Sequence, residues 1–182
     1  LALVMRGLAP EALLDTYHQE RAYAADENIL NSTRSTDFIT PKSATSKLFR
    51  NAALSLARHH PFARKLVNSG RLSLPSFLTV SALNTSDTDA FAGDMVPGAP
   101  MDDAPLQING HDTWLLDHLG HRFQCVLFVE DVAHVSAAQA SALQSLKQGA
   151  IPVEPLVISQ RPGQLPGLTV LTDVQGLFAK RY

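Results

Sequence analysis

The sequence predicts a mixed chain of the α+β or α/β class, in which an N-terminal helical extension precedes a β-α-β domain. No glycine or proline interrupts the chain between Pro10 and Asn31, and apolar residues recur there at helical spacing. From Phe123 onward, short apolar runs alternate with a clear helical segment, which is the order of a β-α-β unit. The 182 residues suffice for one large domain or for a domain with a sizeable extension.

Residues 1–70 are predicted to be helical. The first helix has Pro10 in its first turn and continues to about Asn31, where a Ser/Thr-rich segment is expected to loosen the chain. The second helix is expected from about Thr45 to His59, and a third begins at Pro61. The stripe of the second helix consists of Phe49, Ala52, Ala53 and Leu56. Gly70 is expected just past the end of the third helix, and His59-His60 at the end of the second.

Residues 71–110 are predicted to form an ordered connector. The segment is rich in Ser, Thr, Asp, Pro and Gly, which is typical of turns. It also contains large apolar residues that a disordered linker would not carry. These anchors are Phe77, Leu78, Phe91 and Met95.

Residues 111–182 are predicted to alternate strand and helix. The run Phe123–Asp131 is apolar almost throughout, so we expect a strand that is covered on both faces. A helix follows over Ser136–Gly149, with Ser136 and Gln139 as a capping box. Its β-α-β order implies a parallel strand pair with a right-handed crossover.

The rest of this part is shorter and less regular. "TWLLDHLG" is expected to be a strand end followed by one helical turn, and "PVEPLVIS" and "LTVLTD" are strand candidates. Asp173 is expected to cap a last helix, with a hairpin turn at "TDVQG" as the alternative.

Composition excludes several classes of function. The chain is 45% hydrophobic and 18% charged with a formal net charge of −2, so neither a nucleic-acid partner nor an acidic tail is indicated. No apolar run approaches the length of a membrane span, and no signal peptide is recognisable. Cys125 is the only cysteine, which excludes an intrachain disulfide and favours a reducing, cytoplasmic location.

No residue is assigned to a catalytic, cofactor-binding or metal site. The sequence has no G-x-S-x-G elbow, no G-x-G-x-x-G loop and no Walker loop. The segment Arg161–Gly167 contains prolines that remove the N–H groups an anion would need. His111, His118 and His121 lie close in sequence, and the last two could share a helical face. Because their spacing matches no standard zinc pattern, a polar surface turn is the preferred interpretation and zinc the alternative.

Tyr17, Glu20 and Arg21 form the pattern "Y-x-x-E-R", and "LALVMRG" lies shortly before it. The pattern resembles a signature near the end of the FAD domain in the class A flavoprotein monooxygenases, the aromatic hydroxylases of the phenol hydroxylase and 3-(3-hydroxyphenyl)propionate hydroxylase kind, and "LALVMRG" resembles the end of a preceding helix in that family. "FAGDMVPGAPMDDAPL", "WLLDHLG" and "TDVQGLFAKRY" resemble its C-terminal thioredoxin-like domain, which lacks redox cysteines. Tyr23 stands where a proline is frequent in the family, so a less kinked helix is expected.

The resemblance implies a function for a larger parent protein. That parent is an oxidoreductase with FAD and NAD(P)H as cofactors, and it hydroxylates a small phenol-like substrate. The matching region is its C-terminal part, with residues 1–70 packed on the missing FAD domain and residues 111–182 forming a thioredoxin-like domain without its last strands. Residues 71–110 would be the connector between them. The family's flavin and nicotinamide motifs have no counterpart here, so both ends are expected to be cut and the fragment to be catalytically silent. The resemblance also implies a homo-oligomer.

One alternative comes from another functional class. The chain could be a free-standing, redox-inactive thioredoxin-like module that binds other proteins and carries a helical arm. The lone Cys125 is compatible with both hypotheses, because neither requires dithiol chemistry.

Overall fold

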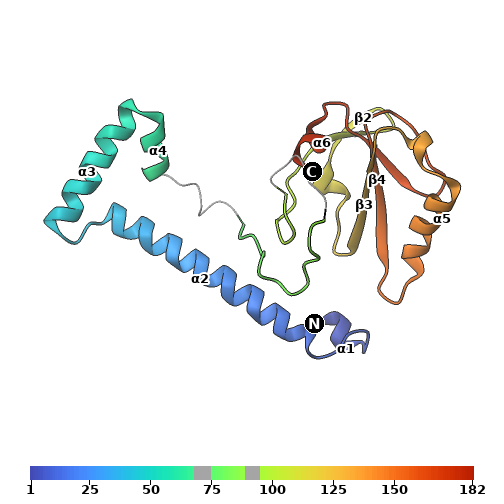
Figure 1. Cartoon of the computed structure of the whole chain (residues 1–182), viewed down its shortest axis with the longest axis horizontal. Helices are drawn as coiled ribbons and strands as arrows, with labels where there is room; N and C mark the ends of the chain where they lie inside the picture. The colour runs from blue at the N-terminus through green and yellow to red at the C-terminus, as the bar shows by residue number, and fades with distance from the viewer. Residues whose placement is uncertain (68–74, 89–94) are drawn as a thin grey trace. The chain divides into compact units, whose positions relative to one another are not determined.

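The computed structural model of this chain describes residues 1–67, 75–88 and 95–182. The chain forms two compact units. The helical unit comprises Glu11–Ser86 and Val96–Pro100, and the sheet unit comprises Leu1–Pro10, Asp87–Met95 and Met101–Tyr182. The predicted mixed class is confirmed, since helices and a five-stranded mixed sheet are both present (Figure 1).

The elements of the helical unit are α2 (Leu13–Ile39), α3 (Ala44–His59) and α4 (Pro61–Val67). Those of the sheet unit are α1 (Ala2–Met5), β1 (Pro105–Ile108), β2 (His111–Trp114), η2 (Leu115–His118), β3 (Phe123–Val129), η3 (Val132–His134), α5 (Ala137–Ser145), η4 (Leu146–Gln148), β4 (Val153–Ser159), β5 (Thr169–Thr172) and α6 (Leu177–Arg181).

Helix α2 differs from its prediction at both ends. It begins at Leu13, so Pro10 lies before the helix and not in its first turn. It continues to Ile39, past the end predicted near Asn31. Serine and threonine are only mildly unfavourable inside a helix, and the first residue able to stop it is Pro41. The Ser/Thr-rich segment is therefore helical through residue 39.

Helix α3 confirms its prediction closely. The Ser43 side chain accepts a hydrogen bond from the Ser46 N–H and caps the N-terminus, and His60 follows the last residue as predicted. Ala53 in the predicted stripe is buried, whereas the Phe49 side chain is 64% exposed. Helix α4 begins at Pro61 as expected, and the Gly70 predicted beyond it lies outside the described residues.

The sheet has the strand order β2-β1-β5-β4-β3. β3, β4 and β5 are parallel neighbours, whereas β1 is antiparallel to both β2 and β5. The segment between β3 and β4 contains α5, so the predicted β-α-β unit with a parallel pair is present. Figure 1 shows α5 on one side of the sheet and α6 on the other. The segment predicted as connector, residues 71–110, ends in strand β1.

The prediction that the β3 run is covered on both faces is wrong. β3 is an edge strand and its residues are only partly buried, with Phe123 and Phe128 exposed. The strand buried on both faces is β4, in which residues 155–159 are all buried. Both runs are apolar, and strand order is a property of the whole sheet that neither run encodes locally.

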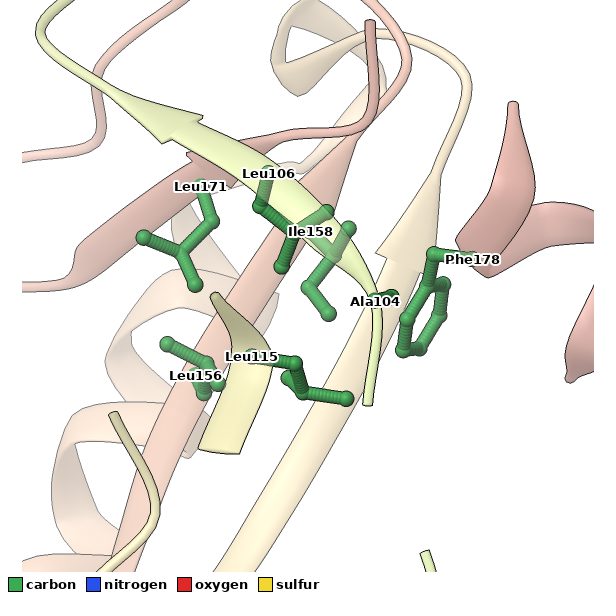
Figure 2. Packing of buried hydrophobic residues seen from close by; sticks show 7 residues of the cluster. All are labelled: Ala104, Leu106, Leu115, Leu156, Ile158, Leu171 and Phe178. Carbon is green, nitrogen blue, oxygen red and sulfur yellow. The ribbon is translucent and has the colours of Figure 1, made fainter. Parts of the chain in front are cut away.

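The main core lies on one face of the sheet. The cluster combines side chains from β1 and the residue before it, from β4 and β5, from η2 and from the last helix, as Figure 2 shows. Its members are Ala104, Leu106, Leu115, Leu156, Ile158, Leu171 and Phe178. The Phe178 ring in α6 stacks on the Tyr182 ring at a centroid distance of 4.5 Å. The Phe178 ring also lies 5.6 Å from the Phe128 ring of β3, so aromatic packing holds α6 against the core.

Both predicted caps of the sheet unit are confirmed. Ser136 and Gln139 form a reciprocal capping box at the start of α5. The buried carboxylate of Asp173 accepts hydrogen bonds from the N–H groups of Leu177 and Ala179 at the start of α6. The helix is thus present and the alternative hairpin at "TDVQG" is not.

Candidate functional site

Within the helical unit, one residue of the "Y-x-x-E-R" pattern on α2 contacts the segment 75–86. Glu20, on α2, accepts a hydrogen bond from the Ser81 hydroxyl at 2.5 Å. Both residues are partly buried. Tyr17, one turn earlier, is 66% exposed, and Arg21 is exposed as well. Of these three signature residues, Glu20 thus holds the 75–86 segment onto α2, while Tyr17 and Arg21 face outward.

The 75–86 segment is fixed by a second set of contacts centred on Leu78. The Leu78 N–H donates to the Gly98 carbonyl at 2.8 Å, and the Leu78 carbonyl accepts from the Asn84 side-chain amide at 2.8 Å. Gly98 has φ of +86°, and a Cβ there would lie 2.4 Å from the Leu78 carbonyl oxygen. Only glycine fits this position, since any side chain would collide with backbone. The side chain of Leu78, one of the predicted apolar anchors, is partly buried, and Phe91 of the same prediction lies outside the described residues.

A shallow hollow of about 390 Å³ lies beside these contacts. It is lined by Thr79, Ser81, Asn84, Thr85, Ser86, Val96 and Pro97. Its polar groups are hydroxyls and one amide, and the amide already bonds to Leu78. No charged residue lines it, so the hollow has no group suited to acid–base work.

A larger open hollow of about 990 Å³ lies in the sheet unit. It is bordered by the β1–β2 turn, the loop 162–168 and the start of β5. Pro162 and Pro166 in that loop have no N–H, and no charged side chain lines the hollow. A flavin or nicotinamide dinucleotide needs donors or a helix N-terminus for its pyrophosphate. The residues that line this hollow include neither a helix N-terminus nor a basic side chain for a pyrophosphate.

The histidines do not form a metal centre in the described part of the chain. His118 ends the short helix η2, and Leu119 after it is extended, so His118 and His121 do not share the helical face that their spacing would have allowed. The His118 Nε2 atom is 2.9 Å from the Thr113 hydroxyl, a hydrogen-bonding distance. Among the described residues, no group of three or more His, Cys, Asp or Glu is placed to hold a metal ion.

The lone cysteine and two further carboxylates, Asp131 and Asp103, belong to local structure. Cys125 is partly buried within β3. The Asp131 carboxylate accepts from the Ala133 N–H, and this hydrogen bond, together with Arg161, lowers the pKa of Asp131. Asp103 accepts from the N–H groups of Ala104 and Leu116. These carboxylates are bound to backbone N–H groups and are not arranged around a reacting centre.

The sequence could not have located these contacts in full. Glu20 stood out because of its signature, but Ser81 is one of many serines and carries no distinguishing pattern.

None of the helices in the described ranges combines the length and the apolar character needed to cross a bilayer. No protein-family model matches this sequence, and no curated protein matches it either.

Proposed function

We propose that this chain is the C-terminal region of an FAD-dependent, NAD(P)H-using aromatic monooxygenase, and that the region itself is structural. The observation that carries the proposal is the division of the matching motifs between the two units. The "Y-x-x-E-R" residues lie on α2 in the helical unit, and the "WLLDHLG" and "TDVQGLFAKRY" blocks lie in the sheet unit, to which "LALVMRG" also belongs. Along the chain, these motifs follow one another in the same order as in the class A flavoprotein monooxygenases that they resemble.

The surface of α2 supports the same proposal. None of its 27 residues is buried, and its apolar side chains include the exposed Tyr17, Ile29 and Ile39. Large apolar side chains that are exposed along a helix are normally buried against a partner. In the proposed parent, the flavin domain supplies that partner, and Glu20 with Ser81 keeps the following segment attached to α2.

We further propose that the sheet unit is a thioredoxin-like domain that serves as a scaffold. The mixed sheet with its β3-α5-β4 unit is compatible with such a domain. Dithiol chemistry is ruled out because Cys125 is the only cysteine. The flavin chemistry belongs to the cofactor and to residues outside this chain.

The test is to isolate the natural polypeptide that carries this sequence from its source. We expect a polypeptide much longer than 182 residues, with the visible absorption of oxidised flavin and with NAD(P)H oxidation that a phenol stimulates. The 182-residue chain produced alone is the matched control, and it should show neither property.

The opposite outcome is equally informative. A natural polypeptide of this length without flavin would overturn the monooxygenase proposal. The free-standing, redox-inactive interaction module would then be the better hypothesis, and pull-down of partner proteins on the isolated chain would be the next measurement.

A further inference from the structure

The strand β3 leaves an apolar sheet edge without a strand partner in the described part of the chain. β4 lies on one side of β3, and no described strand lies on the other. The seven residues Phe123–Val129 include no proline, glycine or charged residue. Exposed edge strands usually carry such residues, because they prevent pairing with another chain. This edge has none of those protections.

The backbone groups available at this edge can be identified. The Val129 carbonyl accepts from the Gln160 N–H at 3.1 Å, so the polar groups of Val129 point toward β4. Backbone direction alternates along a strand, so the N–H and C=O groups of Gln124, Val126 and Phe128 point away from β4. These three residues supply the donors and acceptors that another strand could use.

Charged residues flank the strand with opposite sign at its two ends. Arg122 precedes it, and Glu130 and Asp131 follow it. Arg122 and Glu130 are both exposed. An antiparallel copy of the same segment would therefore place each basic end beside an acidic end, whereas a parallel copy would bring like charges together.

We propose that two copies of this chain associate through antiparallel pairing of their β3 edges, with the twofold axis at Val126. The two five-stranded sheets then form one continuous sheet. In this register Arg122 lies opposite Glu130 of the second copy, and Gln124 lies opposite Phe128 of the second copy. Phe123, which is 59% exposed, gains Val129 of the second copy as its cross-strand neighbour.

Three independent conditions select this register. It pairs outward-pointing residues with outward-pointing residues, as an antiparallel ladder requires. It overlaps all seven residues of the strand. It also matches the flanking charges. A shift of two residues keeps the hydrogen-bonding parity, but it shortens the overlap and moves Arg122 away from Glu130. The inference goes beyond the proposed monooxygenase function, and it concerns the β3 edge as the 182-residue chain presents it.

The test is a charge exchange measured by sedimentation of the full 182-residue chain over a range of concentrations. We expect the wild-type chain to show a monomer–dimer equilibrium. Arg122→Glu and Glu130→Arg should each weaken dimerisation by about tenfold or more, since attraction becomes repulsion at two symmetric places. The double variant should recover most of that loss.

Recovery of dimerisation in the double variant can arise only from a contact between two chains. Arg122 and Glu130 of one chain are eight positions apart on an extended segment, or about 26 Å, too far for a direct contact. Arg122 also lies 3.8 Å from Glu154 in its own chain, a contact that Glu130→Arg cannot restore. Arg34→Glu on α2 is the matched control for net charge, and it should leave dimerisation unchanged. A monomeric wild-type chain, or a double variant as weak as the singles, would overturn the proposal.

A cross-linking measurement fixes the register. Cys125 and Leu127 of the second copy form a non-hydrogen-bonded pair in this register, the closest kind of cross-strand pair. Leu127→Cys should therefore give a covalent dimer with oxidised glutathione, through a disulfide to Cys125. Val129→Cys is the control, because it would meet Cys125 only after a shift of two residues. Absence of the Leu127→Cys dimer, or a stronger Val129→Cys dimer, contradicts the proposed pairing.

Discussion

Glu20 on α2 and Ser81 are hydrogen-bonded to each other although 61 positions separate them in the sequence. The Ser81 hydroxyl also accepts from the Leu83 N–H at 3.2 Å, so it belongs both to its own turn and to the contact with α2. This arrangement connects the signature helix to the 75–86 segment within the helical unit.

We expect Ser81→Ala to lower the free energy of unfolding by about 1 kcal/mol, because the partly buried Glu20 carboxylate loses a donor. Glu20→Gln should cost less, since an amide can still accept from the hydroxyl. A double-mutant cycle of Ser81→Ala with Glu20→Ala, measured by urea unfolding, should give a coupling of about 1 kcal/mol. Ser86→Ala, at an exposed serine of the same segment, is the control and should change little. Zero coupling would show that the contact is not energetically significant.

The glycine at position 98 gives a second prediction. Gly98→Ala should destabilise the chain by about 2 kcal/mol or more, because its positive φ and the Leu78 carbonyl both exclude a Cβ. Hydrogen exchange at the Leu78 N–H, which donates to Gly98, should become faster. Gly110→Ala is a matched control with φ of +80° and nothing within 4 Å of the added Cβ, so it should cost only about 1 kcal/mol. Equal effects at the two glycines would contradict the steric argument.

The elements that were predicted well are those with a strong local signal. α3 has a serine cap and a stop at His59-His60, and α5 has a capping box. The apolar run of β4 stands out in the same way. Such signals involve residues within one or two turns of each other, so a sequence displays them directly. The end of α2 was missed because serine and threonine signal a helix end only weakly.

The features that were not predicted depend on partners distant in sequence. β3 and β4 have similar apolar runs, but β3 is at the edge and β4 in the interior. Ser81 has no feature that distinguishes it from other serines until Glu20 lies beside it. The short strand β1 lies in a proline-rich segment whose sequence does not indicate a strand. Only its pairing with β2 and β5 identifies it. Sheet order and side-chain pairs of this kind are tertiary properties.

The cap of α6 gives a third prediction. Asp173→Ala should lower the free energy of unfolding by about 2 kcal/mol, because the N–H groups of Leu177 and Ala179 lose their buried acceptor. Asp173→Asn should cost less, since one oxygen remains to accept. Thermal unfolding followed by near-UV circular dichroism would measure both. Asp87→Ala, at an exposed aspartate, is the control. If Asp173→Ala unfolds like the control, Asp173 does not stabilise the start of α6.

The last prediction concerns alkaline pH and Tyr182. Burial raises the pKa of Tyr182 above its ordinary value, and the nearby carboxylates of Asp102 and Asp103 act in the same direction. The Tyr182 hydroxyl also donates to the Asp102 carbonyl at 2.7 Å, which only the neutral form can do. A group with a raised pKa stabilises the fold below its unfolded value of about 10, and this contribution is lost as pH rises through the folded value.

We therefore expect the wild-type chain to lose stability as pH rises above about 10, and Tyr182→Phe to lose less over the same range. Phenylalanine retains the stacking on Phe178 but has no proton to lose. Urea unfolding at a series of pH values measures the difference between the two chains, and lysine titration cancels in it. Tyr17→Phe, at an exposed tyrosine, should follow the wild-type curve. If Tyr182→Phe follows that curve as well, the ionisation of Tyr182 is not linked to unfolding.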